Sequence, residues 1–182
     1  IVGDAPSTLR LMLPEIYLEK PGETEKIAAI RKAMHDYIDN GILQNLGEGF
    51  VFTRRSVGGN TRSGLVVALD LECYDYSKGS TTLIRATEGT IVERIPPRLK
   101  IRDGALLELP HILVLIDDEK KTVIEPLAEK LQNTEKLYDF DLMQNGGHIE
   151  GWFVNNEGMI EDVISALNAL VDPNKYGTEM PP

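Results

Sequence analysis

The sequence is poor in cysteine, and it lacks several patterns that would name a function at once. Its single cysteine, Cys73, can neither close an intramolecular disulfide nor build a cysteine-rich zinc site, so we expect a reducing, cytoplasmic location. No apolar run reaches the roughly 18 residues that a membrane span requires, and the N-terminus has no signal pattern. Neither the P-loop pattern nor G-x-G-x-x-G occurs, which disfavours the common mononucleotide and dinucleotide sites.

The composition is that of an average globular protein. Of 182 residues, 42% are apolar and 26% charged, which excludes a disordered or collagen-like chain. The length predicts a single domain over residues 1–172, followed by a flexible C-terminal tail over 173–182. Because the chain begins with Ile1 and ends in a polar stretch, we expect a fragment of a longer protein, although trimmed ends would look the same.

The negative charge is unevenly distributed. The net charge of −10 and the pI near 4.8 disfavour a nonspecific grip on nucleic acid or on an anionic membrane. Residues 49–102 nevertheless contain nine Lys or Arg against five Asp or Glu, a local charge of +4, which leaves −14 for the rest. We therefore expect any affinity for anions to lie in the middle third of the chain.

Apolar periodicity predicts three amphipathic helices. The first spans residues 23–40 and ends at Gly41, and the last follows Asn156 as its N-cap. Thr122 and Glu125 match a capping box, which predicts that a third helix starts there.

Runs of β-branched and aromatic residues predict the strands. Residues 50–57 and 62–71 flank a glycine-containing loop, and residues 138–142 and 149–154 flank a second one, so we expect two hairpins. Residues 9–13 are strand-like, and the continuous apolar run 111–116 predicts a buried strand in the middle of the sheet. Together with the helices, these patterns predict an α+β fold: a mixed, mostly antiparallel sheet with two hairpins covered by helices.

The strongest candidate site lies between Arg85 and Arg102, which we call the basic segment. Thr90 and Glu93 match a second capping box, and Pro96 and Pro97 should break that helix near Ile95. Free amides at the Thr90 helix start and nearby guanidinium groups would suit a phosphate. The candidate anion-binding residues are Arg85, Thr90, Arg94, Arg98 and Arg102, with Glu88 as the candidate catalytic acid or base. A solvated or salt-bridged face is the alternative interpretation.

No metal site is expected. His35, His111 and His148 are far apart in sequence, and none shows a ligand partner at a recognisable spacing, so structural roles are favoured. The acidic run Asp117-Asp118-Glu119 could bind Mg²⁺ after a buried strand, but a solvated turn is the preferred interpretation because two lysines follow it.

Several of these stretches together resemble a known family. They are Arg62-Ser63-Gly64-Leu65-Val66, Arg85-Ala86-Thr87-Glu88-Gly89-Thr90, Leu109-Pro110-His111 and Leu137-Tyr138-Asp139-Phe140. The chain is similar over nearly its whole length to the bacterial and archaeal domain-of-unknown-function family ten-fifteen, whose members are about twice as long. The family in turn distantly resembles the ParB and sulfiredoxin-like group that includes free-serine kinases. The resemblance implies ATP-linked phosphoryl transfer to a small metabolite, with ATP or ADP and Mg²⁺ as cofactors of the full-length protein.

Two departures from the family pattern limit what carries over. Many members have Arg-His-Glu-x-Thr where this chain has 85–90, so only Arg85, Glu88 and Thr90 correspond. An Asp-Gly-[Asn/His]-His motif would be expected just after Met180, so we expect this fragment to be inactive alone.

Three functional hypotheses remain open at the level of sequence. The first is a phosphate- or nucleotide-binding part of a small-metabolite kinase, with a small phosphorylated ligand as its partner. The second is a noncatalytic protein-interaction or regulatory domain, in which the arginines face an acidic partner. Nucleic-acid binding is disfavoured because no aromatic residues alternate with the basic ones. The sequence gives no indication of the oligomeric state.

Overall fold

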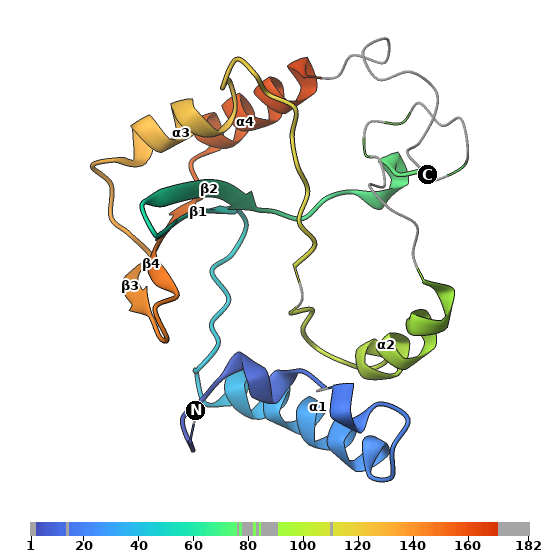
Figure 1. The fold of residues 1–182 in the computed structure, drawn as a ribbon. Coiled ribbons are helices and arrows are strands. Elements are labelled where there is room, and N and C mark those ends of the chain that lie inside the picture. Colours follow the sequence, from blue (N-terminus) through green and yellow to red (C-terminus); the bar gives the residue numbers. More distant parts are fainter. Residues whose placement is uncertain are drawn as a thin grey trace. The chain divides into compact units, whose positions relative to one another are not determined.

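The chain, drawn as a ribbon in Figure 1, divides into two compact units. Each unit has its own apolar core. The computed structural model describes residues 3–13, 15–75, 77, 82, 84, 91–109 and 111–170. Unit 1 comprises Ile1–Asn45 and Gly89–Leu115, and unit 2 comprises Leu46–Glu88 and Ile116–Pro182. That residues 1–172 form one domain stays a prediction, and the expected tail, 173–182, lies outside the described residues.

Unit 1 is built on helix α1, Glu23–Asp39, as the apolar periodicity predicts. Ile30 and Met34 on its inner face are 5% and 2% exposed and pack against Leu11. Gly41 follows the helix with φ +68°, a left-handed conformation that glycine adopts at little cost, which confirms the predicted end.

The strand expected at residues 9–13 is wrong. The chain instead forms a 3-10 helix, η1, at Thr8–Leu11, and the Ser7 hydroxyl accepts a hydrogen bond from the Leu9 amide at 3.2 Å. This local hydrogen bond caps the turn and competes with the extended conformation that the apolar residues suggest. A second 3-10 turn, η2, follows at Glu15–Tyr17.

The described part of the basic segment changes from a 3-10 turn to an α-helix at Ile95, the position where the prolines predict a break, but the helical structure is not interrupted there. A 3-10 turn, η4, spans Val92–Arg94, and α2 runs over Ile95–Arg102 with Pro96 in its first turn. The capping box at Thr90 lies outside the described residues.

Unit 2 contains a four-stranded antiparallel sheet in the order β2-β1-β4-β3. Both predicted hairpins are confirmed: β1, Phe50–Val57, pairs with β2, Asn60–Val66, and β3, Tyr138–Leu142, pairs with β4, Gly147–Val154. β2 begins two residues earlier than expected and ends at Val66. The pairing of β1 with β4 joins the two hairpins into one sheet, which confirms the α+β fold. A 3-10 turn, η3, at Leu71–Cys73 follows the first hairpin.

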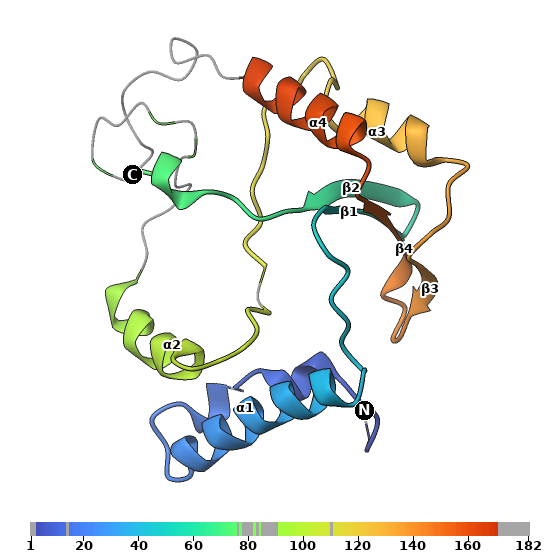
Figure 2. The ribbon, with the colours of Figure 1, turned by 180° about the vertical axis from the view of Figure 1, so that it is seen from behind.

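Two helices of unit 2 cover one face of this sheet. Figure 2 shows α3, Ile124–Leu131, and α4, Glu157–Ala169, lying side by side over the strands. The buried side chains Leu127, Leu131 and Val163 come from these helices and form one core with residues of β1 and β4. The Asn156 side chain accepts a hydrogen bond from the Met159 amide at 3.0 Å, which confirms the predicted N-cap.

The capping box predicted at Thr122 and Glu125 is wrong. The side chain of Asp118 instead holds the two residues that precede the helix: its Oδ2 accepts hydrogen bonds from the Thr122 and Val123 amides at 2.7 and 2.8 Å. The Thr122 hydroxyl donates to Asp118 Oδ1 at 2.9 Å and is therefore engaged before the helix starts. Asp118 therefore takes up the hydroxyl and the amide of Thr122 that a capping box would use, and the N-cap residue of the helix, Val123, makes no side-chain cap hydrogen bond.

The buried mid-sheet strand predicted at residues 111–116 is also wrong. The segment has no strand pairing, and Ile112 and Leu115 are 85% and 78% exposed. β1 and β4 occupy the two central positions of the sheet, because each is brought in by its own hairpin. An apolar run indicates only that burial would be favourable, and in the structure residues 112–116 have no strand partner and stay exposed.

A glycine in β4 gives the first testable prediction. A Cβ at Gly151 would overlap the ring of Tyr138, whereas a Cβ at Gly64 has no atom within 4 Å, although both glycines pair with Thr53. We expect Gly151→Ala to lower the free energy of unfolding by about 1–3 kcal/mol, because the ring must leave its position. Gly64→Ala should change it by less than about 0.5 kcal/mol. Urea unfolding followed by far-UV circular dichroism measures both, and equal losses would contradict the packing described.

Candidate functional site

The helix-covered face of the unit 2 sheet has an apolar half and a polar half. Residues that pair directly across antiparallel strands share a face, and the face repeats every second residue. Phe52 pairs with Leu65 and Trp152, and this row lies in the core under α3 and α4. The next two rows are polar. They are Ser63, Arg54, Glu150 and Asp139, and then Thr61, Ser56, His148 and Asp141.

Six charged or titratable side chains gather on the polar half, and we call them the sheet cluster. They are Arg54, Lys136, Asp139, Asp141, His148 and Glu150. Glu150 is 8% exposed and receives two cations: Arg54 Nε lies 2.7 Å from Oε2, and Lys136 Nζ lies 2.5 Å from Oε1. Lys136 also pairs with Asp139, so one ammonium group bridges two carboxylates.

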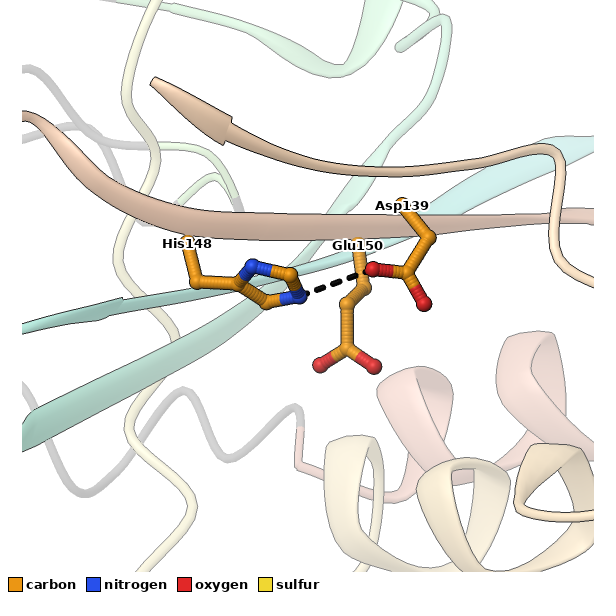
Figure 3. Close-up of side chains that lie close together, drawn as sticks. All are labelled: Asp139, His148 and Glu150. Carbon is orange, nitrogen blue, oxygen red and sulfur yellow. Dashed lines mark ion pairs between the residues drawn. The ribbon is translucent and has the colours of Figure 1, made fainter. Parts of the chain in front are cut away.

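His148 lies between two aspartates. Its Nε2 is 2.8 Å from Asp139 Oδ1, and its Nδ1 is 2.7 Å from Asp141 Oδ1. Figure 3 shows the imidazole and the Asp139 carboxylate pointing toward one another from neighbouring strands, with Glu150 beside them. Both ring nitrogens can therefore donate to a carboxylate, which favours the protonated ring.

The contacts in the sheet cluster lower the pKa of two of its acids, Glu150 and Asp139, and raise the pKa of His148. The hydrogen bond from Arg54 is the main cause that lowers the pKa of Glu150 to about 2, against the effect of burial. The hydrogen bond to Asp141, opposed by desolvation, raises the pKa of His148. The hydrogen bond from Lys136 lowers the pKa of Asp139. These contacts therefore favour the ionised carboxylates of Asp139 and Glu150 and a cationic imidazole.

Some of the sheet cluster can also act as metal ligands. Asp139, His148 and Glu150 each offer one ligand atom, and these atoms lie within 4.8 Å of one another. Carboxylate oxygen and imidazole nitrogen together form a donor set that suits divalent transition metals.

A hollow of about 280 Å³ lies beside the hydroxyl-bearing end of the two polar rows. The side chains around it are Thr61, Ser63, Ile116, Asp118, Ile124, Glu125 and Ala128. Two hydroxyl groups and two carboxylates line it together with aliphatic side chains. Its volume is near the lower limit for pockets that hold small ligands.

A comparison with protein families decides the identity of the chain. The family model described as "Protein of unknown function (DUF1015)" matches residues 1–172. The chain belongs to the DUF1015 family. This confirms the resemblance found in the sequence, whereas no curated protein and no solved structure matches the DUF1015 chain. None of its described helices has the length and apolar character that a bilayer crossing requires.

The structure places only part of the basic segment of this DUF1015 chain. Arg85, Glu88 and Thr90 lie outside the described residues, and the structure describes Arg94 and Arg98 only as backbone positions in η4 and α2. Arg102 at the end of α2 pairs with Glu108 at 2.9 Å, and the two side chains are 49% and 54% exposed. That the six candidate residues share one anion site stays a prediction.

Sequence reasoning missed the sheet cluster of the DUF1015 chain. The sequence spacing predicts no ligand partner for His148, yet His148 contacts Asp139 and Asp141 and lies near Glu150. The signal was present in the alternation of the second hairpin: two acids two residues apart in one strand lie opposite His148 and Glu150 in the next. The pairing with Arg54 could not be predicted in this way, because it needs the register of β1 with β4.

Proposed function

We propose that this domain acts in the cytoplasm as the phosphate-binding part of a phosphotransferase, which moves a phosphoryl group from ATP or ADP to a small metabolite. The basic segment supplies the binding groups. The phosphate charge is neutralised by four arginines, Arg85, Arg94, Arg98 and Arg102. Backbone amides near Thr90 donate hydrogen bonds to the phosphate oxygens. Glu88 serves as the general base that accepts the proton of the attacking group.

The ion pair between Arg102 and Glu108 is the observation that carries this proposal. Both side chains are about half exposed, and an ion pair in such surroundings contributes little to stability. A phosphate offers the guanidinium a doubly hydrogen-bonded partner with more charge than a carboxylate. Arg102 can therefore exchange Glu108 for a ligand at small cost. The local charge of +4 in a chain of net charge −10 supports the same conclusion.

Isothermal titration of the chain with ATP, ADP, phosphoserine and sulfate tests the proposal. We expect binding of at least one phosphorylated compound, and we expect Arg102→Ala to weaken it about tenfold, because a hydrogen bond to a charged group is worth about 1.5–3 kcal/mol. Lys130→Ala is the matched control, since Lys130 is 46% exposed and pairs with Asp162 at the surface of unit 2. No heat with any of the four anions, or an equal loss in both variants, would overturn the proposal.

A noncatalytic interaction domain is the second candidate, and one observation favours it. Ile112–Ile116 presents five consecutive apolar side chains, each between 41% and 85% exposed. Contiguous exposed apolar surface commonly marks a protein contact. In this alternative the arginines of the basic segment contact acidic groups of the partner. A chain that binds none of the four anions would favour this function over the first.

A further inference from the structure

The sheet cluster contains a set of metal ligands that the phosphate proposal does not use. Asp139, His148 and Glu150 project from β3 and β4, and their ligand atoms converge within 4.8 Å (Figure 3). Strand pairing fixes the positions of the three residues, since Asp139 is directly opposite Glu150, and His148 is two residues from Glu150 on the same strand. Strand pairing therefore places the three side chains next to one another.

A cationic group already occupies the point where two of these carboxylates meet. Lys136 Nζ lies 2.5 Å from Glu150 Oε1 and also pairs with Asp139. Lys136 precedes β3, and its side chain is 33% exposed, so it can move into solvent when a stronger cation arrives. The two carboxylates thus bind a positive charge at this point, and in the metal-free chain that charge is the Lys136 ammonium group.

The charge balance favours a dication as the replacement. Asp139, Asp141 and Glu150 carry three negative charges, and Arg54 stays bound to Glu150 Oε2 at 2.7 Å. Metal binding displaces Lys136 and also the proton on His148 Nε2, which passes to solvent, and the divalent ion that replaces these two positive charges restores a local sum of zero. Neutrality matters here because Glu150 is 8% exposed, and an uncompensated charge on it would be costly.

Asp141 is not one of the three ligands, but it orients the histidine ligand. Its Oδ1 lies 2.7 Å from His148 Nδ1, so the neutral imidazole would hold its proton at Nδ1 and present the Nε2 lone pair. A carboxylate on the second nitrogen is the usual support of a metal-binding histidine. The partner of Nε2 in the metal-free structure is Asp139, one of the other two ligands.

We propose that Asp139, His148 and Glu150 bind a divalent transition-metal ion, with Zn²⁺ as the best match, and that Lys136 competes with the metal for the two carboxylates. Zn²⁺ accepts one imidazole and two carboxylates with a fourth position left for water or substrate. Mg²⁺ prefers all-oxygen coordination and fits this set less well. The inference does not depend on phosphate binding, because none of these residues belongs to the basic segment.

Titration of the full, EDTA-treated chain with Zn²⁺ alone, in a buffer without phosphate, tests the inference. We expect one Zn²⁺ per chain, with His148→Gln weakening the affinity at least tenfold and Asp141→Asn weakening it about tenfold. Lys136→Met should instead tighten binding, because it removes the competing ammonium. His35→Gln is the control, since His35 lies on α1 in unit 1, and it should leave the affinity unchanged.

The direction of the Lys136 effect separates a built site from adventitious surface binding. Adventitious binding to histidines would fall with His35→Gln as with His148→Gln, and it would not respond to Lys136→Met. Absence of Zn²⁺ binding, weaker binding by Lys136→Met, or equal effects of the two histidine variants would overturn the inference. Far-UV circular dichroism of each variant ensures that a folded chain is compared, and Glu150→Asp provides a second ligand variant that retains the carboxylate.

Discussion

Replacing Phe52 by alanine is expected to lower the free energy of unfolding of unit 2 by about 3–5 kcal/mol. Phe52 is 1% exposed at the centre of the core that joins β1 and β4 to the helices α3 and α4. Its ring centroid lies 5.5 Å from that of Trp152, with a tilt of 58°. The substitution removes both the buried ring and this aromatic pair, and it leaves a cavity that the two paired strands cannot close.

Phe140→Ala is the matched control for this effect. Phe140 is also an aromatic residue in a strand of the same sheet, but it lies on the edge strand β3 and is 50% exposed. We expect it to cost less than about 1 kcal/mol, because little buried area is lost. Urea unfolding can be followed through Trp152, which is the single tryptophan of the chain and reports on unit 2, together with far-UV circular dichroism.

The comparison remains informative if the alanine variant fails to fold. Phe52→Leu retains most of the apolar volume and should cost about 1–1.5 kcal/mol. A loss for Phe52→Ala no greater than that for Phe140→Ala would contradict the packing of α3 and α4 on this face.

The elements that sequence patterns predicted correctly are those whose determinants are local. The cap at Asn156 and the left-handed Gly41 each act within a few residues of the helix end that they define. The two hairpins likewise depend on short turns between alternating strands. The segment at 111–116 failed for the opposite reason, since burial of an apolar run requires partners that no local pattern specifies.

The contacts of the sheet cluster likewise differ in whether local sequence determines them. The cross-strand contact of His148 with Asp141 lies within one hairpin, so the alternation of residues 138–154 contained enough information to predict it. The contact of Arg54 with Glu150 joins residues 96 positions apart and depends on how β1 pairs with β4. No periodicity in the sequence encodes the pairing of β1 with β4. The position of the sheet cluster at the edge of the core depends on that pairing, so it could not be predicted either.

Glu150→Gln is expected to lower the free energy of unfolding by about 2 kcal/mol at pH 7 in the metal-free chain. The substitution retains the shape of the side chain but removes the charge that two cations share, at 2.7 Å from Arg54 and 2.5 Å from Lys136. Hydrogen bonds to a charged group are worth about 1.5–3 kcal/mol each. The partial exposure of both cations reduces the loss, since water can solvate them when the carboxylate is gone.

The pH dependence distinguishes this electrostatic effect from a packing defect. The pKa of Glu150 falls from 4.5 to about 2 on folding, mainly because of the hydrogen bond from Arg54. A lowered pKa means that the stabilisation is fully present above pH 4.5 and is lost as the pH falls through about 2. The stability difference between the native chain and Glu150→Gln should therefore shrink over this range, whereas a packing defect would persist.

A surface control and a double variant complete the measurement. Glu161→Gln on the exposed side of α4 should change the stability by less than about 0.5 kcal/mol at every pH. Adding Arg54→Met to Glu150→Gln should cost less than the sum of the two single changes, because both remove the same contact. Strictly additive losses would show that the two side chains do not interact in solution. The sheet cluster would then lack the charge coupling that holds Glu150 ionised beside the buried core.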